Sequence, residues 1–183
     1  MKSEKALLII DIQNDYFEGG KMQLVGSLEA SLNAKQLIDI FRNKNYPVIY
    51  IQHVALKPDA TFFLPDTTGT DIHENVKPLD SEKIFIKHFP NSFKDTELLD
   101  YLSFNHIIDL TICGMMTHMC IDATTRAAKD FGFNCTLIGD ACATKDLEYK
   151  GIKINSVDVH NSFLAALNKT YANVISTEDY LNH

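Results

Sequence analysis

The sequence predicts an α/β fold in which helices cover both faces of a six-stranded, mostly parallel sheet. Short apolar runs rich in β-branched residues alternate with longer segments of helical periodicity along the 183 residues. Successive strand-like runs show no tight hairpin turn between them, which favours parallel crossover connections. We therefore expect a Rossmann-like, three-layer α/β/α sandwich, formed by a single domain that spans residues 1–183.

The first strand-like run, residues 6–10, is uniformly apolar, as expected for a strand that is buried on both faces. A helix is expected over residues 27–43, because Ser27 is a good N-cap and large apolar residues recur after it at helical spacing. Pro47 then introduces a second strand over residues 48–51. These elements form the first strand–helix–strand unit.

Residues 55–82 contain three prolines and no periodicity, so they are expected to form a long loop. Loops of this length are uncommon in compact domains and tend to be functional. A third strand is expected over residues 83–87. The helix after it is expected around residues 97–102, with Ser92 or Asp95 as its cap.

The remaining third of the chain completes the alternation. A fourth strand is expected over residues 107–113 and ends abruptly at Gly114, after which Thr117 is expected to cap a helix. The last elements expected are a strand over residues 133–138, a helix over 157–167 and a strand over 172–175.

Composition and charge exclude several classes of partner. The net charge is −7 and there is no basic block, so neither nucleic acid nor a membrane surface is expected as a partner. The apolar runs are much shorter than the ~20 residues that a bilayer requires, and no signal peptide precedes residues 6–10, so we expect a cytoplasmic protein. The four cysteines lack the spacing of a zinc site and are expected to be reduced.

Cys120 is the strongest candidate for a nucleophile. It falls in the first turn of a helix that leaves the carboxyl end of a strand. Backbone N–H groups and the helix dipole at such a position are expected to lower the pKa of a thiol. Cysteine is also among the most buried residue types, so the alternative is that Cys120 packs as a small hydrophobic residue.

Two charged residues support the catalytic interpretation. Asp11 directly follows the first apolar run, and Lys87 ends the strand with the sequence KIFIK. The carboxyl ends of parallel strands meet at one edge of the sheet, where ligands bind in this fold class. Either charge alone could be explained as a solvated surface residue. A carboxylate, an ammonium and a thiol at the same edge of the sheet are better explained by a catalytic site.

These three residues have the properties that amide hydrolysis requires. Asp11 is the expected base, Lys87 the cation that stabilises the anions, and Cys120 the nucleophile. The amides of the turn before Cys120 are donors for an oxyanion. The expected reaction is attack on a small carbonyl substrate, departure of an amine, and hydrolysis of the resulting thioester.

Five segments carry a resemblance to a known family. The chain resembles the isochorismatase-like cysteine hydrolase superfamily over about residues 6–144, in the segments LLIIDIQNDYF, VIYIQHV, IFIKHFPNSF, ICGMMTHMCIDATTRAAKDFGF and LIGDACAT. The resemblance implies a three-layer α/β/α sandwich with a six-stranded parallel sheet. It also places the family's triad on Asp11, Lys87 and Cys120.

The resemblance implies further features of the site. A cis peptide is expected between Met115 and Met116, which would turn the Met116 N–H toward an oxyanion beside the N–H of Cys120. Gln13 is expected at the pocket edge, with a plain turn hydrogen bond as the alternative. His118 is expected either to contact the substrate or to cap the loop. Independently of the resemblance, five aromatic residues lie in loops at the expected active edge and are candidates to wall an apolar pocket, with packing in the core as the alternative: Phe17, Phe62, Phe63, Phe89 and Phe93.

The nicotinamidase branch of this family carries a metal on an Asp-x-His pair after the second strand. Here the corresponding segment is Gln52–His53–Val54–Ala55, without that pair. His53 and His73 remain without a suitably placed carboxylate, so we expect no metal and no other cofactor. His53 is expected to be a hydrogen-bonded histidine at a strand end. Nicotinamide is correspondingly doubtful as the substrate.

Two other functions stay open at the level of sequence. Isochorismate-cleaving members of the family hydrolyse an enol ether without a cysteine nucleophile, and Cys120 weighs against that chemistry. A non-catalytic relative would instead use Cys120 as a redox sensor. The resemblance also implies a homo-oligomer, a dimer or a larger assembly.

Overall fold

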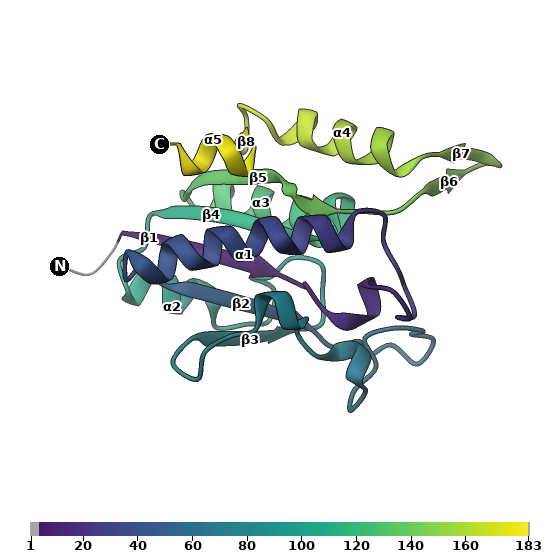
Figure 1. Cartoon of the computed structure of the whole chain (residues 1–183), viewed down its shortest axis with the longest axis horizontal. Helices are drawn as coiled ribbons and strands as arrows, with labels where there is room; N and C mark the ends of the chain where they lie inside the picture. Colours follow the sequence, from purple (N-terminus) through teal and green to yellow (C-terminus); the bar gives the residue numbers. More distant parts are fainter. Residues whose placement is uncertain (1–3, 183) are drawn as a thin grey trace.

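The computed structural model describes residues 4–182, and it confirms the predicted fold class. A six-stranded sheet forms the centre of the molecule (Figure 1). All its neighbouring strands pair in parallel. In spatial order the strands are β3 (Lys83–Lys87), β2 (Val48–His53), β1 (Lys5–Ile10), β4 (Asp109–Met115), β5 (Asn134–Ala143) and β8 (Asn173–Ile175).

Helices cover both faces of this sheet, as predicted. One face carries α1 (Ser27–Asn43) and α5 (Thr177–Leu181), which contact each other, and the opposite face carries α2 (Leu98–Phe104), α3 (Asp122–Asp130) and α4 (Ser156–Leu167) (Figure 1). The chain builds the sheet outward from β1 in one direction and then from β4 in the other. The connections that leave β1 and β4 therefore diverge, which is the usual position of a ligand site in such sheets.

The central strand β1 is buried along its length because it pairs with β2 on one side and β4 on the other. Leu7, Leu8 and Ile10 have no solvent exposure. Ile10 lies opposite Gly114 of β4. A Cβ atom at Gly114 would lie 1.9 Å from the Ile10 carbonyl oxygen, so only glycine allows the two strands to approach this closely.

The predicted caps of the first two helices are wrong. Ser27 is the first residue of α1 rather than its cap, which is Gly26 with φ of 75°. The Ser27 hydroxyl donates instead to the Leu24 carbonyl. Neither Ser92 nor Asp95 caps α2, because this helix begins only at Leu98.

The prediction that no hairpin interrupts the alternation is also wrong. Strands β6 (Leu147–Tyr149) and β7 (Ile152–Ile154) form an antiparallel hairpin that projects from the body of the molecule (Figure 1). Lys150 and Gly151 form its turn, both with positive φ, which is the conformation that two-residue hairpin turns require. The short helix α5, which begins with a capping box between Ser176 and Asp179, was not predicted either.

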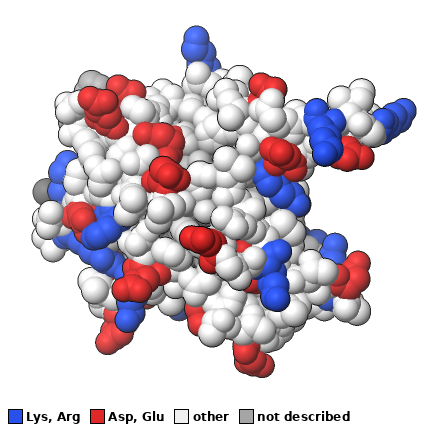
Figure 2. Space-filling model, turned by 45° about the vertical axis from the view of Figure 1, so that its right-hand side comes forward, with Lys and Arg blue, Asp and Glu red and all other residues white. Residues whose placement is uncertain are grey.

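The surface does not present a continuous area of one charge in the view of Figure 2, where acidic and basic side chains are interspersed. Within residues 4–182, no helix has the length and apolar character needed to cross a bilayer. All four cysteines are free and buried.

Candidate active site

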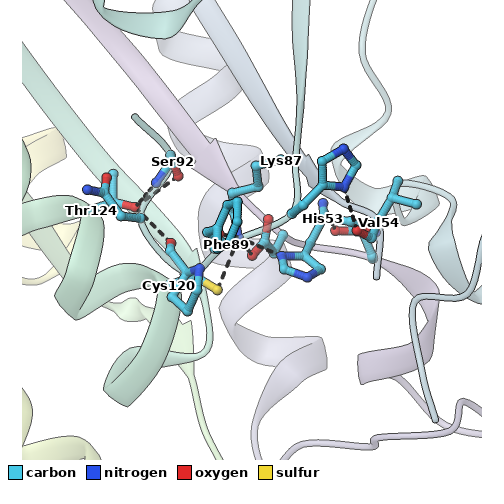
Figure 3. A network of polar contacts seen from close by, with 12 residues as sticks. His53, Val54, Lys87, Phe89, Ser92, Cys120 and Thr124 are labelled. Atoms are coloured by element: carbon cyan, nitrogen blue, oxygen red, sulfur yellow. Dashed lines mark hydrogen bonds and ion pairs between the residues drawn. The ribbon is translucent and has the colours of Figure 1, made fainter. Parts of the chain in front are cut away.

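The structure brings Asp11, Lys87 and Cys120 together at the carboxyl edge of the sheet. Asp11 follows β1, Lys87 ends β3, and Cys120 lies in η4 (Thr117–Ile121), a π-helical turn between β4 and α3. The Lys87 Nζ lies 2.7 Å from Asp11 Oδ2 and 3.2 Å from Cys120 Sγ. Asp11 and Lys87 are completely buried and Cys120 is 6% exposed. Figure 3 shows the sulfur directed toward the end of the Lys87 side chain.

The Lys87 ammonium is surrounded by four acceptors. Besides Asp11 and Cys120, it contacts His53 Nδ1 at 3.0 Å and the Phe89 carbonyl oxygen at 3.1 Å (Figure 3). Burial lowers the pKa of Lys87, but the Asp11 carboxylate and Cys120 raise it by more, so the net shift is upward. An ammonium has three N–H donors, so at least one of them is shared between acceptors.

His53 is a neutral acceptor in this cluster. Burial and the adjacent Lys87 ammonium lower the pKa of His53 to about 4. Because Lys87 can only donate, His53 Nδ1 accepts from it and the ring proton lies on Nε2. The expectation of a hydrogen-bonded histidine at the end of β2 is confirmed, although its partner is the ammonium at the centre of the site.

The expectation that the helix start lowers the pKa of Cys120 is wrong. Burial and the Asp11 carboxylate raise the pKa of the thiol, and Lys87 opposes them without cancelling them. The sulfur is enclosed and beside a negative charge, which outweighs the field of a single helical turn. In the resting state the thiol therefore keeps its proton.

Asp11 is placed to receive that proton. Its carboxylate, a ring nitrogen of His53 and the Cys120 sulfur lie within 4.8 Å of one another. Both Asp11 oxygens are enclosed, and apart from the Lys87 ion pair they have no hydrogen-bond donor among the described residues. Asp11 has a φ of 52°, a left-handed conformation that aspartate tolerates better than most residues. Lone pairs of the carboxylate are thus available to a proton from sulfur.

The elbow between β4 and η4 contains the expected cis peptide between Met115 and Met116. Thr117 does not cap the following turn, which is a correction to the sequence-based expectation. Its hydroxyl donates to the Ala143 carbonyl at 3.3 Å and lies 2.9 Å from His160 Nδ1, so it ties the elbow to β5 and α4. The assignment of the Met116 and Cys120 amides to an oxyanion hole stays a prediction.

A cavity of about 420 Å³ opens onto the Cys120 sulfur. Of the aromatic residues predicted to wall a pocket, Phe62, Phe63 and Phe89 line it. The other lining residues come from the β2–β3 connection, from η1 (Asn14–Tyr16) and from the segments after β3 and β4, namely Tyr16, His53, Ala55, Leu56, Lys57, Asp59, Ala60, Thr61, His88, Pro90, Met116, Met119 and Cys120. The wall is mainly apolar.

The structure places four other predicted pocket residues outside this wall. Gln13 bonds the backbone of His53 and Thr70. The ring of Phe17 stacks on His73 with centroids 3.6 Å apart. His118 Nδ1 contacts the Thr144 hydroxyl at 2.5 Å. The ring of Phe93 lies against those of Phe131 and Phe133. Each of these groups contacts a neighbour within the protein, and for Gln13 and His118 a contact of this kind is the alternative to facing the substrate.

Two features of the site were not predicted. Tyr16 lines the cavity, and its position five residues after Asp11 in the same segment was the available signal. Behind Cys120, the Thr124 hydroxyl accepts from the Ser92 N–H at 3.0 Å and lies 2.8 Å from the Ser92 hydroxyl (Figure 3). This pair fixes the segment after β3 against α3, and nothing in the sequence pattern links its two members.

Asp11, His53 and Cys120 have the spacing of a metal site. The donor set does not fit a divalent cation, however, because the Lys87 ammonium already contacts all three at 2.7, 3.0 and 3.2 Å. A metal ion would have to replace a buried positive charge that these groups stabilise. His73 lies apart from them, stacked on Phe17.

Comparisons with known proteins agree with this geometry. Residues 5–179 match the family model described as the isochorismatase domain. The chain is 47% identical to the uncharacterized isochorismatase family protein YddQ of Bacillus subtilis, over 96% of this chain and 98% of that protein. It is 31% identical to a streptothricin hydrolase of Streptomyces noursei, over 78% of this chain and 56% of that protein. A solved isochorismatase-hydrolase structure from Oleispira antarctica superposes with a TM-score of 0.95 at 44% identity, over the full length of both chains.

Proposed function

Because the chain belongs to the isochorismatase family and is a cysteine hydrolase of that family, we propose that it cleaves a C–N bond of a small amide through a thioester on Cys120. One observation carries the proposal: a buried ammonium contacts both a carboxylate and a thiol that faces a mainly apolar cavity. These are the base, the cation and the nucleophile that acyl transfer to sulfur requires.

The reaction begins when the Cys120 sulfur attacks the substrate carbonyl carbon and the thiol proton passes to Asp11. The tetrahedral intermediate then expels the amine, which takes that proton as it leaves, and a thioester remains. In the second half, a water molecule gives a proton to Asp11 and its oxygen attacks the thioester carbon. The sulfur leaves and recovers the proton, so the products are a carboxylic acid and an amine or ammonia.

Lys87 keeps its charge throughout these steps. Its contact with Asp11 pairs the carboxylate with a positive charge before attack, and its contact with Cys120 stabilises the developing thiolate. The redox-sensor alternative fits less well, since sensor cysteines are exposed and have low pKa values. Cys120 is 6% exposed, and burial raises its pKa.

The substrate is a small molecule, and the cavity supports an uncharged one. The charged side chains of the wall, Lys57 and Asp59, are exposed to solvent, whereas Phe63 and Met116 of the same wall are buried. A volume of about 420 Å³ lies in the range of small-molecule sites. The streptothricin hydrolase among the relatives is by its name a hydrolase of streptothricin.

Ammonia release from a panel of small amides, without added metal, tests the proposal. Cys120→Ala should abolish release and keep the fold, whereas Cys135→Ala, which removes a buried thiol on β5, should keep full activity. Hydrolysis of an enol ether that survives Cys120→Ala would favour the ether hydrolase instead. Selective peroxide oxidation of Cys120 in a protein that hydrolyses none of the panel would favour the redox sensor.

We propose further that the protein works as a homo-oligomer in the cytoplasm. Free cysteines fit a reducing compartment.

An isolated two-stranded hairpin is marginally stable in water, yet β6–β7 carries Tyr149 and Ile152, each 67% exposed. Contact with a second copy would cover them. Light scattering should give the mass of a dimer or larger assembly, and a lower mass for a Tyr149→Ser/Ile152→Ser variant; a monomeric wild type contradicts the proposal.

A further inference from the structure

Tyr16 is a buried polar residue that the reaction described above does not use. It belongs to η1 and is 1% exposed. Its ring packs against Phe63, with centroids 4.6 Å apart, and against Phe62 at 6.0 Å. Together with Cys120 it lines the cavity, so its side chain forms part of the wall that a bound substrate would touch.

The Tyr16 hydroxyl makes no hydrogen bond to another described residue, and Tyr16 lines the cavity. The enclosed side-chain polar atoms that lack a partner are both Asp11 oxygens and the Thr125 hydroxyl. The Tyr16 hydroxyl is not one of them, so it keeps a small exposure of its own. The rest of the residue is buried, and the cavity is the open space that Tyr16 lines.

A buried phenol normally finds a partner, because an unsatisfied hydroxyl costs free energy. Burial, and then the neighbouring Cys120 and Asp11, raise the pKa of Tyr16 well above its ordinary value. The phenol therefore keeps its proton and is available as a donor at any pH at which the protein works. Its position close to the reacting groups leaves a bound ligand as its natural acceptor.

We propose that the Tyr16 hydroxyl recognises the substrate by donating a hydrogen bond to an acceptor next to the carbon that Cys120 attacks. The proposal deepens the proposed function and rests on it for the position of the substrate. The chemical class is a small, uncharged amide whose acyl part is apolar except for this acceptor. Tyr16 is then a specificity-determining residue, since a substrate without the acceptor leaves its hydroxyl without a partner.

Alkylation of Cys120 tests this recognition without any need for turnover. Iodoacetamide carries a carbonyl acceptor next to its reactive carbon, and iodoethane has none. With either reagent an S–C bond forms as the C–I bond breaks, iodide leaves, and the thiol proton passes to Asp11 or solvent. Peptide mass spectrometry measures the rate at Cys120 in the wild type, in Tyr16→Phe and in a matched control, Tyr180→Phe. The control removes a phenol that contacts Thr111, outside the residues that line this cavity.

Tyr16→Phe should slow the reaction with iodoacetamide by about three- to tenfold, the value of one neutral hydrogen bond. It should change the rate with iodoethane by less than about twofold, because that reagent offers no acceptor. Tyr180→Phe should change neither rate. The melting temperature of Tyr16→Phe should equal or exceed that of the wild type, since the deleted oxygen has no partner within the protein.

Four results would overturn the proposal. Equal slowing with both reagents would mean that the hydroxyl acts on the sulfur, and no slowing would mean that it does not reach the ligand. A lower melting temperature would assign Tyr16 a structural role. Failure of iodoacetamide to modify wild-type Cys120 would show that the cavity does not admit an amide. Ammonia release by wild type and Cys120→Ala is measured separately, so the recognition proposal and the proposed function can fail independently.

Discussion

Replacing Lys87 by methionine removes the positive charge at the centre of the site and keeps an unbranched side chain. The wild-type ammonium lies 2.7 Å from the Asp11 carboxylate, and both side chains are completely buried. At an effective dielectric constant of ~20, two unit charges this far apart attract by about 6 kcal/mol, before the cost of burying them is subtracted. Removing one partner of a buried pair typically destabilises a protein by about 3–5 kcal/mol.

The expected loss also has an upper limit that depends on pH. Without Lys87, the buried Asp11 can avoid an uncompensated charge by binding a proton in the folded state. Keeping an aspartic acid protonated at pH 7 costs about 4 kcal/mol, and at pH 5 about 1.5 kcal/mol. The folded variant then binds more protons than the unfolded chain, so its stability rises as the pH falls. We expect a deficit of about 3–4 kcal/mol at pH 7 that shrinks toward pH 5.

Urea unfolding at several pH values measures the deficit, and ammonia release measures the rate. A protonated Asp11 cannot accept the thiol proton, so the rate should fall by about 10²–10⁴-fold, the usual contribution of a general base. Lys35→Met is the matched control: its partner Asp39 lies 3.2 Å away with both side chains 52% exposed, and the expected loss is under about 1 kcal/mol. Lys87→Met/Asp11→Asn should regain most of the stability and none of the rate.

The reasoning would be refuted by a Lys87→Met protein that loses less than about 1 kcal/mol at pH 7. A deficit that does not change between pH 7 and pH 5 would show that Asp11 does not take up the missing charge. A rate within about tenfold of wild type would remove the triad assignment altogether.

Two further predictions concern groups around the triad. The pKa of His53 is about 4 in the folded state, compared with an ordinary value of 6.5. Between pH 6.5 and pH 4 the unfolded chain therefore binds more protons than the folded protein, so the free energy of unfolding falls as the pH drops through this range. The loss should approach about 3 kcal/mol in urea unfolding and be absent in His53→Gln; parallel pH curves for the two proteins would contradict this. Thr124→Val leaves the buried Ser92 groups without their partner and should cost about 1–3 kcal/mol, whereas Thr125→Val, whose enclosed hydroxyl has no partner, should be neutral or stabilising. Equal effects of the two valine variants would show that the Ser92 bond contributes nothing.

The triad could be predicted from the sequence because each member is marked by its own local signal. Asp11 follows an uninterrupted apolar run, and Lys87 ends a short strand. Cys120 follows the elbow after Gly114. The parallel sheet brings these three residues together, because it places the carboxyl ends of β1, β3 and β4 at one edge. Local patterns and a single rule of topology were sufficient.

The cavity wall could not be predicted in the same way, because long-range hydrogen bonds shape it. Gln13 fixes the connection between β2 and β3 through the backbone of His53 and Thr70. Asp15 accepts from the Phe63 N–H at 2.6 Å, across 48 positions of the chain. No periodicity records such contacts. The aromatic residues that reach the cavity, such as Phe62, therefore could not be separated in advance from those that do not, such as Phe17.

The protonation of Cys120 was predicted wrongly for a related reason, and the correction explains how a buried thiol can still be the nucleophile. A helix start alone favours a thiolate, but the sulfur lies in an enclosed cluster that already contains one anion. Transfer of the thiol proton to Asp11 replaces a carboxylate by a thiolate beside the same ammonium. The net charge of the cluster does not change, so no additional charge has to be buried during attack. The raised pKa of the free thiol therefore measures the cost of losing its proton to water, whereas the reaction requires only the smaller cost of moving that proton to a neighbour.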